Sequence, residues 1–72
     1  MNTKTILAKN LKAFMQSRGY NIAKLSRETK IARSTIHSVL NKKTQRIDIE
    51  NLESICATLE IPVYFLFQNY EI

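Results

Sequence analysis

Glycine and proline, the residues that tight turns most often require, occur only once each in this chain, as Gly19 and Pro62. An all-β protein of 72 residues would need a turn about every 8–12 positions, and therefore many more residues of this kind. The hydrophobic fraction of 44% and the charged fraction of 24% are ordinary for a globular protein. The sequence therefore predicts one small all-α domain, with no room for a second domain or for a large substrate cavity.

The spacing of apolar residues divides the chain into five predicted helices. The residues between them suit helix ends, because Asn21 and Asp48 are good N-caps and Gly19 suits a C-terminal stop. Pro62 is tolerated only in the first turn of a helix, so a new helix begins there. The predicted helices cover residues 3–18, 22–29, 33–41 and 49–60, and a short stretch that begins at 62.

Positive and negative charges are segregated along the sequence. Residues 1–47 hold all eleven Lys and Arg residues and a single acid, Glu28, which gives a net charge of +10. Residues 48–72 hold five acids and neither Lys nor Arg, a net charge of −5. A basic face of this strength attracts a polyanion, and nucleic acid is the natural partner. The charge pattern alone leaves a solvated surface as the alternative.

Two short predicted helices joined by about three residues, the second with a small polar outer face, form a helix-turn-helix pattern. Over residues 11–67 the chain resembles the five-helix, lambda-repressor-like DNA-binding domain of the Cro and C1 repressors. The resemblance implies one compact domain over 1–72, in which helix 33–41 is the recognition helix. The positions that carry it are Leu25, Ile31, Arg33, Ser34, Thr35, Ile36, Asn41, Leu52, Ile55, Leu59, Ile61, Leu66 and Phe67.

The polar side of helix 33–41 is the expected base-reading surface. The major groove of B-DNA is about 12 Å wide and admits one α-helix, whose N-terminal side chains can reach base edges. Arg33 suits a bidentate bond to guanine, and small neighbours allow close approach. For His37 the alternative is a solvated side chain. The expected base contacts are Arg33, Ser34, Thr35, His37 and Ser38.

Contacts with the DNA backbone are expected from the residues around that helix, because phosphate contacts supply most sequence-independent affinity. The alternative for the cations among them is a solubilising surface charge. Lys4, Lys9 and Lys12, by contrast, are expected to face solvent. The expected backbone contacts are Asn21, Asn41, Lys42, Lys43 and Arg46.

Three positions depart from the family pattern. Ile22 stands where the family usually has a glutamine that binds phosphate, so that contact is lost or replaced. Lys30 stands at the turn glycine and would need an unfavourable positive φ if the usual turn geometry is kept. Ala32 stands at the usual Ser or Thr cap, which forfeits a bond worth about 1 kcal/mol. These departures bear on docking to DNA more than on the fold.

Five large apolar residues follow Pro62 in succession, more than one face of a short helix can bury. The resemblance implies core positions for Leu66 and Phe67. We therefore expect the others to form the interface of a homodimer that binds a roughly palindromic operator. The alternative is that residues 68–72 fold back over them. The expected interface residues are Val63, Tyr64, Phe65 and Tyr70.

These observations predict a cytoplasmic, homodimeric regulator of transcription that binds double-stranded DNA, a repressor rather than an enzyme. An antitoxin or interaction module that binds a partner protein through its apolar C-terminal end is the alternative. We expect no cofactor and no metal, because one His and one Cys cannot supply the ligands of a zinc site. A single cysteine, Cys56, and the lack of a signal-peptide pattern favour the reducing cytosol, and no stretch approaches a membrane span.

Overall fold

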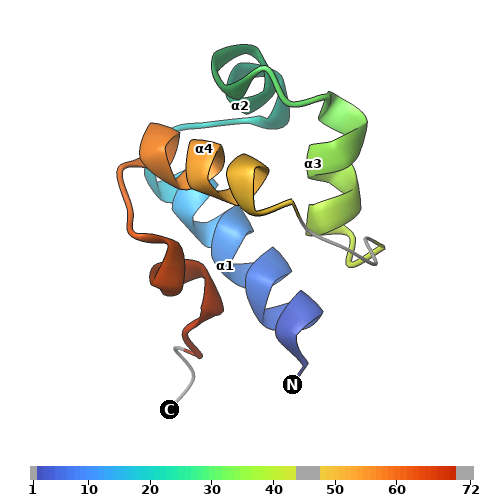
Figure 1. The fold of residues 1–72 in the computed structure, drawn as a ribbon, viewed down its shortest axis with the longest axis vertical. Helices are drawn as coiled ribbons and strands as arrows, with labels where there is room; N and C mark the ends of the chain where they lie inside the picture. Colours follow the sequence, from blue (N-terminus) through green and yellow to red (C-terminus); the bar gives the residue numbers. More distant parts are fainter. Residues whose placement is uncertain (1, 44–47, 70–72) are drawn as a thin grey trace.

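The protein is built from helices (Figure 1). Its structure is a computed structural model, which describes residues 2–43 and 48–69. Within these residues there is no strand, so the predicted all-α class is confirmed. The fifth predicted helix is a 3-10 helix rather than an α-helix. The elements are α1 (Thr3–Ser17), α2 (Ile22–Thr29), α3 (Arg33–Leu40), α4 (Ile49–Leu59) and η1 (Val63–Phe67).

The helix ends lie within one residue of their predicted positions because local bonds fix them there. The side-chain oxygen of Asn21 accepts a bond from the Lys24 backbone N–H at 2.8 Å, which caps α2. Asp48 caps α4 in the same way through the Glu50 N–H, also at 2.8 Å. Gly19, with φ of 73°, lets the chain leave α1 in a left-handed conformation.

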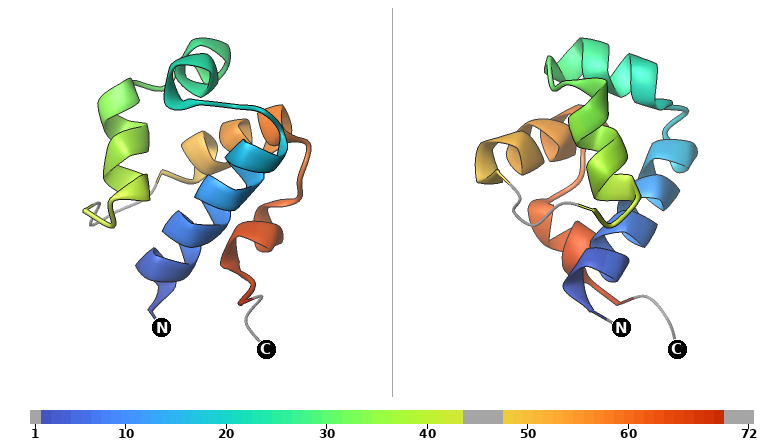
Figure 2. Two further views of the ribbon diagram at one scale, coloured as in Figure 1. Left: turned by 180° about the vertical axis from the view of Figure 1, so that it is seen from behind. Right: turned by 90° about the vertical axis from the view of Figure 1, so that its right-hand side faces the viewer.

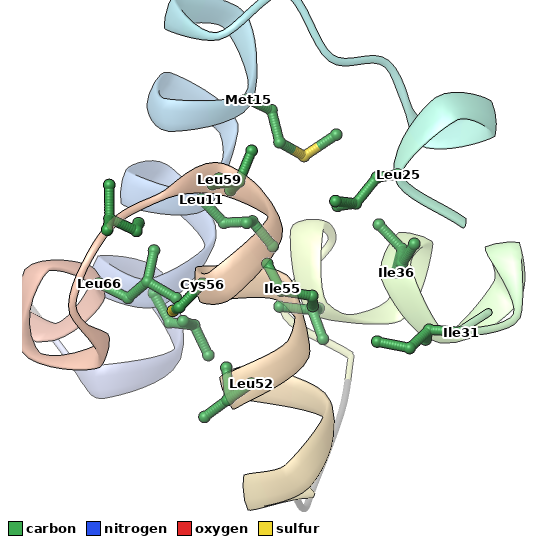
Figure 3. Packing of buried hydrophobic residues seen from close by; sticks show 13 residues of the cluster. Leu11, Met15, Leu25, Ile31, Ile36, Leu52, Ile55, Cys56, Leu59 and Leu66 are labelled. Carbon is green, nitrogen blue, oxygen red and sulfur yellow. The ribbon is translucent and has the colours of Figure 1, made fainter. Parts of the chain in front are cut away.

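The apolar sides of all five elements meet in one core, shown in Figure 3. In it α1 packs against α3 and η1, α2 packs against α3 and α4, and η1 also touches α4. This arrangement leaves the outer side of α3 uncovered. The largest fully buried side chains are Leu11, Leu25, Ile36, Leu52, Leu59, Leu66 and Cys56.

The turn between α2 and α3 keeps a left-handed residue, although a lysine occupies that position. Lys30 has φ of 63° and ψ of 20°, and its N–H donates to the Ser26 carbonyl at 2.8 Å. The Ser26 hydroxyl donates to the Ile31 carbonyl at 2.6 Å, and the Ile31 N–H donates to the Thr29 hydroxyl at 3.2 Å. These bonds hold the turn in place while Lys30 accepts a backbone conformation that glycine would adopt without steric cost.

Asn10 ties the C-terminal segment to α1. Among the described residues it is the only buried polar one, with 6% of its surface exposed. Its Nδ2 group donates to the carbonyl oxygens of Leu66 at 2.9 Å and Gln68 at 2.7 Å, and it lies 3.4 Å from that of Phe65. Together these contacts anchor η1 at both its centre and its end.

The expected core position of Phe67 is wrong, because 40% of its surface is exposed. A 3-10 helix has three residues per turn, so Leu66 shares its inward face with Val63 rather than with Phe67. Phe65 is half-buried, and its ring stacks on that of Phe14 with centroids 5.9 Å apart. Tyr64, with 61% of its surface exposed, stands outside, as expected.

Candidate nucleic-acid interface

The outer side of α3 brings together all five residues that the sequence nominates for base contacts. Its apolar residues Ile36 and Val39 are buried in the core, so the remaining side chains turn outward. The right-hand view of Figure 2 shows α3 crossing the front of the molecule with no element over it. Arg33, Ser34, Thr35 and His37 are exposed and Ser38 is half-buried.

The chain turns sharply at the end of α3 and places polar side chains directly after it. Asn41, Lys42 and Lys43 are all exposed. The turn is held by backbone bonds from the Asn41 N–H to the His37 carbonyl and from the Lys43 N–H to the Ser38 carbonyl, both 2.9 Å long. Lys42 adopts φ of 62°. Arg46, the last expected backbone contact, lies outside the described residues.

At the start of α2, Asn21 is exposed next to the C-terminal half of α1. Because its side-chain oxygen caps α2, its NH2 group is the part able to donate to a phosphate. The N-terminus of α2 adds the partial positive charge of the helix dipole at the same place.

Tyr20, which precedes α2, contacts two side chains of that helix, and the sequence analysis did not predict this. Its hydroxyl donates to a carboxylate oxygen of Glu28 at 2.8 Å, and the Lys24 ammonium lies 4.4 Å from its ring centroid. The hydrogen bond to Glu28 raises the pKa of Tyr20, with smaller contributions from desolvation and from the charges of Glu28 and Glu60. The spacing of four residues between Tyr20, Lys24 and Glu28 was the available signal.

Three of the expected interface residues lie on η1, away from α3, so this surface does not overlap the outer side of α3 (Figure 1). Tyr64 is exposed, whereas Val63 and Phe65 are half-buried and Tyr70 lies outside the described residues. Phe67, which the sequence placed in the core, adds a second exposed aromatic ring to Tyr64.

Other kinds of site find little support in the described part of the chain. It contains no group of three His, Cys, Asp or Glu side chains that could hold a metal ion. Cys56 is buried, and burial raises the pKa of its thiol. None of the described helices has the length and apolar character that a membrane crossing requires.

Solved structures share this fold. A hypothetical transcription factor from Neisseria, NHTF, matches with a TM-score of 0.88 and 25% identity over 96% of this chain and 78% of that one. SinR, a protein of Bacillus subtilis, matches in its complex with SinI, with a TM-score of 0.81 and 22% identity over 88% of this chain and 61% of that one. The structure of SinR in complex with DNA matches with a TM-score of 0.81 and 22% identity, over 86% of this chain and 98% of that one.

Among curated proteins no match was found. A family model for the Cro/C1-type HTH DNA-binding domain matches residues 10–63, which include α2, α3 and α4 in full. This chain therefore belongs to the family of Cro/C1-type helix-turn-helix DNA-binding domains.

Proposed function

We propose that this DNA-binding regulator is a homodimeric repressor that reads a palindromic operator by placing α3 in the major groove. The observation that carries the proposal is the uncovered outer side of α3, which is polar along its whole length and is followed directly by exposed Asn41, Lys42 and Lys43. A repressor of this kind acts by occupying DNA that polymerase needs.

Arg33 is the main specificity residue in this proposal. It stands exposed at the first position of α3, where its planar guanidinium can form two bonds to a guanine. A pair of that kind is worth about 1–3 kcal/mol of discrimination against the wrong base. The short side chains of Ser34 and Ser38 allow the helix to approach the bases. Thr35 meets a thymine methyl group or the backbone, and His37 donates to a phosphate or accepts from a base.

Phosphate contacts on the two sides of α3 set affinity and register in this proposal. Asn41, Lys42 and Lys43, with Arg46, bind the backbone after α3. Asn21 does so at the start of α2. These groups supply binding that is independent of sequence and weakens as salt rises.

Dimerisation through η1 gives the affinity that one short helix lacks. Specific binding has dissociation constants of about 10⁻⁸–10⁻¹¹ M, beyond the reach of three or four short contact residues. The proposal assigns the dimer contact to exposed Tyr64 with half-buried Val63 and Phe65 and, outside the described residues, Tyr70. The domain measures 33 × 25 × 18 Å, a size that allows two copies to hold their recognition helices about one DNA turn, 34 Å, apart.

The test is to select bound duplexes from a random-sequence DNA pool at near-physiological salt and to sequence the enriched fraction. Enrichment of a two-fold symmetric motif is expected. Arg33→Ala should then relax one base position in each half-site, whereas Lys43→Ala should weaken binding to every sequence about equally. Failure to enrich any motif would reject sequence-specific readout by α3.

A second candidate function, capture of a partner protein, is favoured by the exposure of both Tyr64 and Phe67 on η1. An antitoxin that masks its toxin would use such a face, and one of the similar solved structures is a complex of SinR with the protein SinI. Sedimentation separates the two cases. A dimer that becomes a folded monomer in the Tyr64→Ser variant supports the first, and a wild-type protein that is monomeric at all concentrations supports the second.

A further inference from the structure

A groove of about 440 Å³ lies between three helices, where the second half of α1, the start of α2 and the end of α3 meet. Its floor is apolar and includes Met15, Ile22 and Leu40. Met15 is buried, whereas Ile22 and Leu40 are only half-buried, so part of their apolar surface stays open to the groove. The volume falls within the range of about 300–1,000 Å³ that is usual for small-molecule sites. The groove can therefore hold a small apolar body.

The rim of the groove suits an anion. Lys12 and Gln16 are exposed one helical turn apart on α1, and Lys12 is the single charge among the described residues of the lining. Asn21 joins them at the start of α2, where its NH2 group can donate and the helix dipole adds partial positive charge. One lysine balances one negative charge, which favours a carboxylate over a phosphate dianion. An apolar floor beside such a rim is complementary to a small molecule that joins an apolar chain to a carboxylate.

The groove borders the surface that the proposed function assigns to DNA. In the right-hand view of Figure 2, α1 and the start of α2 lie to one side of α3. Asn21 belongs to both surfaces, because its NH2 group is also the donor assigned to a phosphate. A carboxylate bound to that group would occupy the donor and repel an approaching phosphate. Ligand and DNA would then exclude each other, so that each lowers the affinity for the other.

We propose that the groove is an effector site for a medium-chain carboxylate, whose chain packs on Met15, Ile22 and Leu40 and whose carboxylate lies at Lys12 and Asn21. Occupation of this site releases the protein from its operator. The release rests on the proposed DNA-binding function, whereas binding of the ligand itself does not. The inference gives one common ligand to Lys12 and Ile22, which the proposed function leaves without a role.

The probe is octanoate, and its control is octylammonium, which has the same chain and the opposite charge. Each is titrated into isotope-labelled protein, and NMR follows the backbone amide signals. Octanoate should shift the signals of the residues that line the groove. Its affinity should rise about two- to fourfold for each CH2 group added from butanoate to octanoate, because each added group covers more of the apolar floor. Octylammonium should bind about tenfold more weakly, because Lys12 repels it.

Two pairs of variants test the rim and the floor separately. Lys12→Ala should reduce the preference for octanoate over octylammonium. Lys4→Ala removes the same charge about two helical turns away on α1, and should change this preference much less. Ile22→Gln should weaken octanoate binding about tenfold, because it places an amide on the apolar floor. Ile49→Gln makes the same change at an isoleucine of α4 that is 65% exposed, and should have no effect.

The effect on DNA is measured with an operator duplex, and acetate at the same concentration is the ionic control. Octanoate should weaken operator binding by the wild-type protein but not by Ile22→Gln. If the shifted signals belong to η1, or if no signal shifts up to about 10 mM octanoate, the inference is wrong and the proposed function stands. Octanoate that binds in the groove without changing operator affinity overturns the effector role. A protein that binds octanoate there but binds no duplex overturns the proposed function and the effector role, while the ligand site stands.

Discussion

Removal of the Asn10 side chain should be the most damaging single change outside the apolar core. Its Nδ2 group carries two hydrogens, and the short bonds at 2.7 and 2.9 Å use both. In Asn10→Ala the buried Leu66 carbonyl loses its partner, which lowers the free energy of unfolding by about 2 kcal/mol. The part-buried Gln68 carbonyl can bond to water instead, so loss of its bond lowers the free energy of unfolding by only about 1 kcal/mol. The total of about 3 kcal/mol is a large part of the roughly 4–11 kcal/mol expected for a domain of this size.

Urea unfolding followed by circular dichroism measures this loss directly, and thermal unfolding should show a Tm lower by about 12–24 °C. The matched control is Asn2→Ala, because Asn2 is exposed and its side chain accepts a bond from the Thr5 N–H at 2.9 Å. Loss of that helix cap should cost about 1 kcal/mol. If Asn10→Ala costs no more than Asn2→Ala, the bonds to η1 contribute no net stability and the reasoning is refuted.

Three further predictions concern single residues. Lys30→Gly should raise the free energy of unfolding by about 0.5–1 kcal/mol, because glycine accepts the left-handed turn without steric cost. Lys30→Ala removes the same charge but should not raise the free energy of unfolding, and urea unfolding measures both variants. Cys56 should react with a thiol reagent only at the rate at which the protein opens, since burial covers it and raises its pKa, and full reactivity in the native protein would contradict the packing. The bond from Tyr20 to Glu28 raises the pKa of Tyr20 above its ordinary value of 10.0. The bond therefore stabilises the fold fully below pH 10.0, and this stabilisation is lost as the pH rises through the pKa that Tyr20 has in the folded state. The stability difference between wild-type protein and Tyr20→Phe should therefore vanish in strong alkali.

Helix positions were predictable from sequence because they depend on local signals. The caps Asn21 and Asp48 and the stop at Gly19 act within a few residues, and all three behave as predicted. The fifth helix was not predictable in type. Nothing in the run after Pro62 distinguishes an α-helix from a 3-10 helix, and the difference moved Phe67 from the expected core to the surface.

The polar side of α3 was predictable because helical periodicity alone decides which of its residues face outward. Features that depend on distant segments were not. Asn10 stands on the apolar stripe of α1, three residues after Leu7, and this break in the pattern was its only signal. Its partners, 56 and 58 positions further on, could not be read from spacing. The groove of about 440 Å³ that is lined by Lys12, Ile22 and Leu40 likewise exists only because α1, α2 and α3 meet there.

The contact between Asn10 and η1 also has a consequence for the order in which the chain folds. It joins residues 56 positions apart, so a long loop must close before the bond can form, and such contacts tend to form late. By the same argument they should open early. Cys56 on α4 and Leu66 on η1 belong to the same buried cluster (Figure 3), and η1 packs against α4, so detachment of η1 would uncover that thiol while α2 and α3 remain paired. Local opening of this end, rather than global unfolding, should then set the rate at which Cys56 becomes accessible.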